Sequence, residues 1–179
     1  MFRKFESLLN PFPPEEPVEP PKTLVAFCIH YTRGAWPYII VSTALMSVLA
    51  FAEVWLFSFM GNIVDWLSNS SRETFLQTEG WKLAAMAALV LLVMPVLDWF
   101  RSLLSQQTLM GNYPMRIRWM VHRYLLKQSM TFYQDEFAGR VATKLMQTAL
   151  AVRECILKLF EVLNYVVVYF AGVLIIAAS

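Results

Sequence analysis

The sequence predicts an all-α protein: an integral membrane helical bundle with long cytoplasmic helical extensions. Of its 179 residues, 58% are hydrophobic and only 16% are charged, whereas soluble domains contain about 25% charged residues. Three largely uncharged runs are long enough to cross the hydrocarbon core of a bilayer, which takes ~20 residues. The connection at 101–161 has no tract rich in Gly, Pro or Ser, so we expect it to be helical as well.

Composition also excludes several classes of site. The net charge is only +2, and the aromatic residues stand in apolar runs rather than among basic clusters, so we expect no nucleic-acid partner. Cys28 and Cys155 lie far apart without a second ligand at metal spacing, which indicates reduced, inert thiols. His30 and His122 stand apart from any carboxylate or cysteine pattern, which favours surface or interfacial roles. We therefore expect no metal site and no catalytic residue in this stretch.

The first 21 residues are expected to form a separate N-terminal segment. Apolar residues at 2–9 recur at helical spacing, which predicts a short amphipathic surface helix. Residues 11–21 contain six prolines and three glutamates, a composition that blocks helix propagation and predicts an extended linker. The start lacks the apolar core and cleavage site of a secretory signal, so we expect the N-terminus to be retained.

Residues 22–179 are expected to form a membrane domain that begins with an elbow at 22–33. In this elbow apolar and basic side chains occupy different faces, as in a helix that lies in the membrane interface. The apolar face is Leu24, Phe27, Cys28 and Tyr31, and the basic residues are Lys22, His30 and Arg33. The alternative is that the stretch forms the first turns of the following span.

Three transmembrane spans are predicted, at about 35–60, 81–100 and 162–179. A polar connection is expected at Gly61–Gly80, between the first two spans. Pro95 interrupts the second span, where we expect a kink that neighbouring helices can accommodate. The third run is still apolar where the chain stops, so we expect the sequence to belong to a longer membrane protein.

The basic residues predict the orientation in the membrane. The connection at 101–161 carries nine Lys or Arg residues, whereas the connection between the first two spans contains Arg72 and is followed by Lys82. By the positive-inside rule, the long connection is cytoplasmic. Basic residues before the first span agree, so the N-terminus is expected to be cytoplasmic too.

The connection at 101–161 is expected to form a long helical hairpin below the membrane. Apolar residues recur among Gln, Arg and Lys from Arg101 to Tyr133, which predicts that the second span continues as a helix, bent at Gly111 and Pro114. A turn is expected near Asp135–Gly139, where polar residues and a glycine interrupt the pattern. A second helix then leads back to the third span.

Two stretches resemble the membrane domain of ATP-binding cassette (ABC) exporters, and the resemblance covers about Lys22 to Ser179. Phe132–Leu145 is similar to that family's two aromatics, five intervening residues, a glycine and a Ser-Arg-apolar pattern, with Thr143 and Lys144 in place of Ser and Arg. Gly61–Asp65 resembles the end of the family's first span. An elbow, two spans with a short external connection, and a long cytoplasmic hairpin are also typical of this type 1 membrane domain.

The resemblance implies that the hairpin tip is a coupling helix, which docks on a nucleotide-binding domain and transmits its ATP-driven closure to the spans. The residues that it assigns to this interface are Phe132, Tyr133, Gln134, Asp135, Glu136, Phe137 and Gly139. The alternative is that Phe132 and Tyr133 only pack the hairpin against its neighbours. The resemblance also implies membrane lipid and a second transmembrane domain as partners, in a homo- or heterodimer, and a location in the plasma (bacterial inner) membrane.

The chain contains no ATPase motif. No glycine begins a GxxxxGK[ST] phosphate loop, and no apolar run ends in an acidic pair that could hold magnesium. Whether the protein is an enzyme is therefore open. The family hydrolyses ATP to drive transport, so the resemblance implies ATP and Mg²⁺ for the complete transporter, with the nucleotide-binding domain further along the chain or on a partner chain.

Glu53 and Asp98 are the only carboxylates within the first two predicted spans. Charge is costly there, so each could line a translocation pathway or bind a cationic substrate. The alternative is a structural role, with Glu53 near the outer interface and Asp98 near the inner one, paired with Arg101 three residues on.

Two functional hypotheses follow. The first is the membrane-spanning part of an ATP-driven ABC exporter, which forms the translocation pathway and couples to a nucleotide-binding domain through the cytoplasmic hairpin. The alternative is a non-ATPase membrane protein, either an ion-coupled permease or a membrane-anchored interaction module. Midplane polar groups in discontinuous spans, which are typical of permeases, are not evident in these spans.

Overall fold

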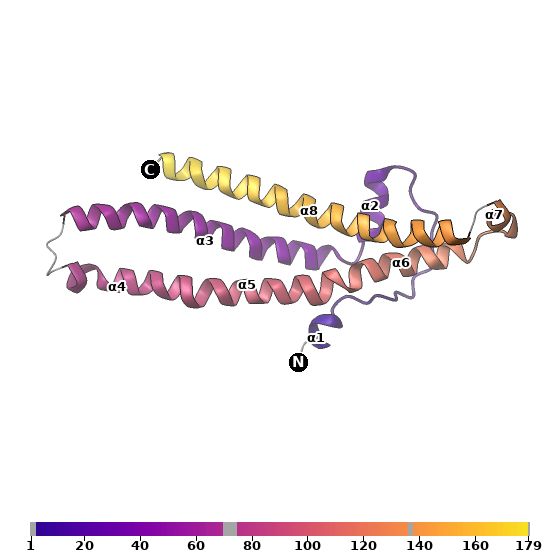
Figure 1. The fold of residues 1–179 in the computed structure, drawn as a ribbon, viewed down its shortest axis with the longest axis horizontal. Helices are drawn as coiled ribbons and strands as arrows, with labels where there is room; N and C mark the ends of the chain where they lie inside the picture. The colour runs from indigo at the N-terminus through magenta and orange to yellow at the C-terminus, as the bar shows by residue number, and fades with distance from the viewer. Residues whose placement is uncertain (1–2, 70–74, 136–137, 179) are drawn as a thin grey trace. The chain divides into compact units, whose positions relative to one another are not determined.

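A computed structural model of the chain describes residues 3–69, 75–135 and 138–178. Helices make up most of these residues, and none of them forms a strand, so the predicted all-α class is confirmed. In chain order the helices are α1 (Arg3–Glu6), α2 (Leu24–Thr32), α3 (Trp36–Asn69), α4 (Phe75–Ala88), η1 (Leu89–Val93), α5 (Met94–Leu103), η2 (Leu104–Met110), α6 (Asn112–Leu125), α7 (Met130–Asp135) and α8 (Ala138–Ala178) (Figure 1).

The chain divides into two compact units. Met1–Ser42 and Leu103–Phe160 form unit 1, and Thr43–Ser102 and Glu161–Ser179 form unit 2. Three helical stretches within the described residues are long and apolar enough to cross a membrane; they are Trp36–Gly61, Gly80–Leu125 and Gly139–Ile175. Each of them contains all or most of one predicted span, as expected for an integral membrane protein.

The first long helix extends well beyond the predicted span. α3 continues to Asn69 and α4 begins at Phe75, so the polar connection predicted at Gly61–Gly80 is largely helical. Apolar residues keep a helical spacing after Gly61, and a single glycine within a helix costs only about 1 kcal/mol. The polar connection predicted here is therefore formed mostly by helix in its described part, a feature that the sequence prediction did not specify.

The second long stretch is distorted next to Pro95. A π-helical segment, η1 (Leu89–Val93), lies directly before it. Proline lacks an N–H group, and its ring clashes with the carbonyl four residues earlier. A π-helical turn is a common way to accommodate such a disruption, so the helix is irregular on the N-terminal side of Pro95, and the kink expected there stays a prediction.

The helix type changes near Gly111 and Pro114, where a bend was predicted; the bend itself stays a prediction. The π-helical segment η2 ends at Met110, and α6 begins at Asn112. Pro114 stands in the first turn of α6, where its missing N–H is tolerated because the first four N–H groups of a helix have no intrahelical partner.

The first helix of the hairpin ends earlier than predicted, at Leu125 instead of Tyr133. The N–H groups of residues 126–128 donate to carbonyls in the last turn of α6, which closes the helix and turns the chain. The predicted continuation to Tyr133 was wrong because polar residues of this turn compete for the backbone hydrogen bonds.

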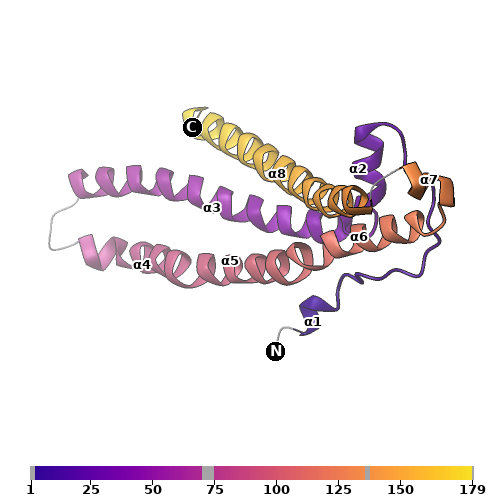
Figure 2. The ribbon, with the colours of Figure 1, turned by 45° about the vertical axis from the view of Figure 1, so that its right-hand side comes forward.

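A short separate helix, α7, follows this turn at the hairpin tip (Figure 2). The Ser129 Oγ accepts a hydrogen bond of 3.4 Å from the N–H of Phe132, which is the contact that a serine makes when it caps a helix. The turn predicted at Asp135–Gly139 includes Glu136 and Phe137, which lie outside the described residues, and α8 begins at Ala138.

The core of unit 1 forms where the elbow helix, η2, α6 and α8 meet. Its buried apolar members are Leu9, Cys28, Tyr31, Ala35, Ile39, Leu109, Tyr113, Ile117, Ala149, Val152 and Ile156. The hydroxyl groups of Thr32 in α2 and Tyr113 in α6 share a hydrogen bond of 2.6 Å inside this core. Arg153 of α8 donates to the carbonyl of Met110 at 3.3 Å, so the two arms of the hairpin are joined by polar contacts as well.

The elbow helix presents a different face to its surroundings than the sequence predicted. Cys28 and Tyr31, which we expected in the membrane interface, are buried in the core of unit 1. The exposed apolar side chains of α2 are Leu24, Val25 and Ile29. The apolar pattern was too broad to separate the protein-facing side of the helix from the exposed side.

Unit 2 contains close packing between α3 and α8. Ala50 and Val54 of α3 are buried, and a Cβ atom placed on Gly172 of α8 would lie 2.7 Å from a methyl group of Val54. Small residues at such a contact let two membrane helices approach closely. A hydrogen bond from Ser47 to the side chain of Asn164 joins the same two helices.

We predict that Gly172→Ala destabilises this contact by about 1–3 kcal/mol, because the added methyl group overpacks a site that Val54 already fills. The measurement is the thermal unfolding midpoint of the purified protein in detergent. Gly61→Ala is the matched control, since a Cβ there would meet no atom within 4 Å. The combination of Gly172→Ala with Val54→Ala should recover part of the loss, and no recovery would contradict this packing.

Candidate functional site

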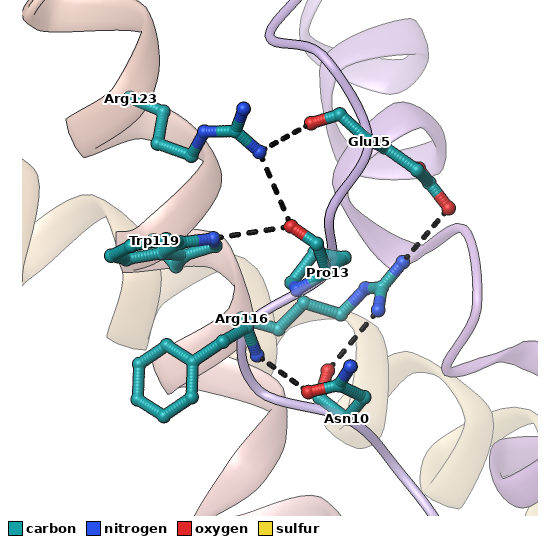
Figure 3. A network of polar contacts seen from close by, with 7 residues as sticks. Asn10, Pro13, Glu15, Arg116, Trp119 and Arg123 are labelled. Atoms are coloured by element: carbon teal, nitrogen blue, oxygen red, sulfur yellow. Dashed lines mark hydrogen bonds and ion pairs between the residues drawn. The ribbon is translucent and has the colours of Figure 1, made fainter.

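The proline-rich segment lies along α6 and is not a free linker. We call residues 10–21 the strap. Arg116 donates a hydrogen bond of 3.1 Å to the carbonyl of Asn10, and Trp119 Nε1 donates one of 3.2 Å to that of Pro13. Arg123 donates to the carbonyls of Pro13 and Glu15, at 3.3 and 2.7 Å. Figure 3 shows this network.

The chemistry of the two partners explains why the strap binds here. A proline-rich segment has few N–H donors but keeps all its carbonyl acceptors. Three donor side chains stand on one face of α6 because Arg116, Trp119 and Arg123 are spaced by three and four residues. The ring of Phe12 also packs edge-on against that of Trp119, with centroids 5.3 Å apart. Aromatic and donor-bearing grooves bind proline-rich peptides in the same way.

Charge adds to these contacts unequally. The guanidinium of Arg116 lies 3.6 Å from the carboxylate of Glu15, and its side chain is only 8% exposed. Lys127 and Glu16 also lie 3.6 Å apart, but they are 57% and 86% exposed, and such surface pairs contribute little. The electrostatic attachment of the strap therefore depends mainly on Arg116.

Arg116 also packs against the turn between the elbow and the first span. Gly34, which follows α2, has a φ of +102°, and a Cβ atom there would lie 3.0 Å from Arg116 Nη2. Glycine adopts positive φ readily, and it commonly ends a helix in this way. The same glycine thus turns the chain into α3 and leaves room for the guanidinium.

The segment before the strap is attached to the core by its backbone carbonyls. Thr108 of η2 donates to the carbonyl of Phe5 at 2.8 Å, and Asn112 donates to that of Glu6 at 2.6 Å. The hydroxyl of Tyr38 donates to the carbonyl of Leu8, and Leu9 is only 2% exposed. Polar and apolar contacts together fix this part of the chain on unit 1.

A cavity of about 260 Å³ lies beside the hairpin tip. The strap, α2, α6, α7 and α8 all contribute to its lining, which includes Pro20, Phe27, Tyr31, Tyr124, Phe132 and Lys144. Burial, with the neighbouring Tyr124 as the second cause, raises the pKa of Tyr31 to about 12. Burial likewise raises the pKa of the Cys28 thiol in the same helix, so both side chains are neutral at physiological pH.

The residues predicted at the coupling interface have different environments. Phe132 lines the cavity and is half-buried, so it makes the packing contacts that the alternative hypothesis expected. Tyr133 is 37% exposed, and its hydroxyl donates a hydrogen bond of 2.6 Å to the carbonyl of Leu125. Gln134 is exposed, and Asp135 is the last residue of α7.

The remaining predicted interface residues add little to this geometry. Gly139 lies in the first turn of α8, and a Cβ there would meet no atom within 4 Å, so packing within unit 1 does not require glycine. Glu136 and Phe137 lie outside the described residues. Contact of this tip with a partner stays a prediction.

A second cavity, of about 130 Å³, lies in unit 2 and brings both predicted pathway residues together. Glu53, Asp98, Arg101 and Tyr165 line it with apolar residues of α3. The expectation that Glu53 and Asp98 lie near opposite membrane interfaces was therefore wrong. Glu53 is far from the end of its helix because α3 continues for sixteen residues, from position 53 to Asn69.

The two carboxylates in this cavity have different partners. Asp98 pairs with Arg101 at 2.8 Å, as predicted from their spacing. Glu53 accepts a hydrogen bond from the hydroxyl of Tyr169, whose ring stacks on that of Tyr165 with centroids 5.7 Å apart. Within the described residues, Glu53 forms no ion pair, so the cavity has one carboxylate whose charge is not matched by a cation.

Some binding residues were missed by sequence analysis. We did not expect Arg116, Trp119 and Arg123 to bind the N-terminal segment. A signal was present, because a stripe of donors on one helix and a run of prolines with free carbonyls are complementary. Neither feature indicates its partner by itself.

We predict that Tyr133→Phe loosens α7, because it removes the hydrogen bond to Leu125 and with it about 1 kcal/mol. Hydrogen exchange of the α7 amides should then be about fivefold faster. Tyr124→Phe is the control, since its hydroxyl forms no hydrogen bond among the described residues. Equal protection of α7 in wild type and Tyr133→Phe would show that this bond does not hold the tip.

We predict that Gly34→Ala lowers stability by about 1–3 kcal/mol, because alanine at positive φ is strained and its Cβ crowds Arg116. Gly111→Ala is the matched control, because a Cβ at Gly111 would meet no atom within 4 Å. The thermal unfolding midpoint should fall for the first variant alone. Equal midpoints for both variants would argue against a role of this turn in placing Arg116.

Comparison with known proteins finds similarity to one curated protein. No family model matches the chain, and no solved structure matches it. The chain is 44% identical, over 179 residues, to an uncharacterized ABC transporter ATP-binding protein of Haemophilus influenzae (strain ATCC 51907 / DSM 11121 / KW20 / Rd). The match covers 99% of this chain, strap included, and the chain spans 29% of the relative's length. The chain is thus homologous to part of an ABC transporter protein, and its three long apolar helices fit a membrane domain.

Proposed function

We propose that this chain is the membrane-spanning part of an ATP-driven ABC exporter, coupled to a nucleotide-binding domain through the tip of its hairpin. The observation that carries the proposal is α7, a separate short helix between two arms that continue into membrane-length helices. The similarity to an ABC transporter protein over nearly the whole chain supports it.

The contacts of α7 are those expected of a helix that transmits the movement of a partner domain to the rest of the hairpin. The side chain of Phe132 enters the cavity between the arms, and the hydroxyl of Tyr133 is bonded to the end of α6. A displacement of α7 would therefore move α6 and α8 rather than bend the tip alone. Tyr133 and Gln134 leave exposed surface for a partner, and the aromatic ring is a typical anchor of such interfaces.

The complete transporter would contain further parts. ATP and Mg²⁺ would bind to a nucleotide-binding domain, on the same chain or on a partner chain. A second membrane domain, identical or different, would complete the pathway. Exposed apolar side chains on all three long helices are available for contact with lipid or with that second domain. The proposed location is the plasma (bacterial inner) membrane, with the N-terminus in the cytoplasm.

Within unit 2, Glu53 is the better candidate for a pathway residue. Arg101 neutralises Asp98 at 2.8 Å, which favours a structural role for that pair. Glu53 faces the same cavity, and among the residues that the structure describes its hydrogen-bond partner is the hydroxyl of Tyr169. An unpaired carboxylate among membrane helices commonly marks a substrate or ion pathway.

The test is ATPase activity of the complete protein in nanodiscs. We predict that Tyr133→Ala lowers turnover about 5- to 30-fold, which corresponds to the loss of about 1–2 kcal/mol at an interface anchor. Met146→Ala is the control, because it truncates a half-exposed apolar side chain on α8 instead of one on α7. Wild-type turnover in Tyr133→Ala would contradict coupling through α7. Absence of ATPase activity in the complete protein and its partners would favour the non-ATPase alternative.

A further inference from the structure

The strap follows α6 along nearly its whole length. Its Asn10 lies at Arg116, and its Glu16 lies at Lys127 near the end of the helix. The contacts follow the same order along both segments, from Asn10 at Arg116 through Pro13 at Trp119 to Glu15 at Arg123, so the strap binds in register with α6.

Beyond these contacts the strap connects two other parts of unit 1. The end of the strap that precedes α2 reaches the cavity at the hairpin tip, which Pro20 lines together with Phe27 of α2 and Phe132 of α7. The chain then enters α2, which leads through Gly34 into α3. The strap is therefore bound to α6, adjoins the α7 cavity, and is covalently continuous with the elbow that precedes the first span.

The burial of its attachment indicates a permanent contact rather than a releasable one. Leu9, next to the strap, is 2% exposed, and Arg116 is 7% exposed. Release would expose an apolar side chain and leave a buried guanidinium with fewer hydrogen bonds, both of which are costly. The weak surface pair of Lys127 and Glu16 alone could be lost easily.

We propose that Arg116, Trp119 and Arg123 are positioning residues for coupling: they bind the strap as a brace that makes α2 and α6 move as one body. This inference rests on the proposed function. In the braced protein, displacement of the tip reaches the second span directly through α6, and the first span through the strap and α2. α2 and α6 also meet directly, through the hydrogen bond of Thr32 with Tyr113 and through the buried core that contains Tyr31 and Ile117, so the brace adds a second attachment outside this core.

The test measures the distance between α2 and α6 in the complete protein. Nitroxide labels are placed at Leu24→Cys, at the start of α2, and at Leu126→Cys, directly after the last residue of α6; these positions are 77% and 68% exposed in the wild type. Cys28 and Cys155 are replaced by Ser, as are other accessible cysteines. Pulsed electron–electron double resonance then gives the distribution of distances between the two labels in nanodiscs, without nucleotide and after trapping with ATP, Mg²⁺ and vanadate.

For the braced protein, the mean distance should agree within about 2 Å in the two states. The variant Trp119→Phe/Arg123→Gln removes three strap hydrogen bonds but keeps the aromatic ring and leaves buried Arg116 in place. It should show a broader distribution with a longer-distance population, even without nucleotide. Arg118→Gln is the matched control, since Arg118 forms no hydrogen bond to the described strap residues, and it should match the wild type.

The outcomes distinguish a failure of the brace from a failure of the proposed exporter function. An unchanged distribution in Trp119→Phe/Arg123→Gln without nucleotide overturns the brace, whatever the ATPase result. If trapping with ATP, Mg²⁺ and vanadate changes the mean distance between the labels in the wild type by well over 2 Å, α2 and α6 do not move as one body. This result also overturns the brace. If the wild type neither hydrolyses ATP nor traps vanadate, the proposed function fails, while the nucleotide-free comparison still decides whether the strap braces the two helices.

Discussion

Much of unit 1 depends on one buried guanidinium, that of Arg116. It donates to the carbonyl of Asn10, lies near the carboxylate of Glu15 and packs against the turn at Gly34. Three segments that are distant in the sequence therefore meet at one side chain of α6. A buried charge is stabilising only when its partners are in place, so the position of the strap and the turn into α3 are coupled through the same group.

The polar groups of unit 2 show how a membrane environment constrains a chain. With no water in the hydrocarbon core, polar side chains must find partners within the protein. Ser47 bonds to Asn164, Tyr169 to Glu53, and Arg101 to Asp98. Two of these pairs join α3 to α8, and together with the close contact at Gly172 they give these helices a specific relative register. Glu53 is the exception among them, since its hydroxyl partner carries no charge.

Length and apolar composition were sufficient to predict the three membrane-length helices, because both properties are local. Helix ends were less predictable. The end of α6 at Leu125 and the start of α7 depend on competition between side chains and backbone for the same hydrogen bonds. The extended conformation of the strap was predicted but its attachment to α6 was not, because its donors lie 106 residues away along the chain and its acceptors are backbone carbonyls, which are the same for every residue type. The common cavity of Glu53 and Asp98 depended likewise on the true length of α3.

Binding through carbonyls has a consequence for how the strap can change in evolution. Apart from Phe12, which packs on Trp119, the side chains of the strap contribute little to its recognition by Trp119 and Arg123, and Val18 and Glu16 are largely exposed. Substitutions there are tolerated as long as the segment stays extended and rich in proline. The constraint falls instead on the donor side chains of α6. The sequence of the strap can therefore change while these donors must stay the same. A strap of this kind is also a tolerant site for engineering, where reporter side chains can be introduced without loss of its attachment.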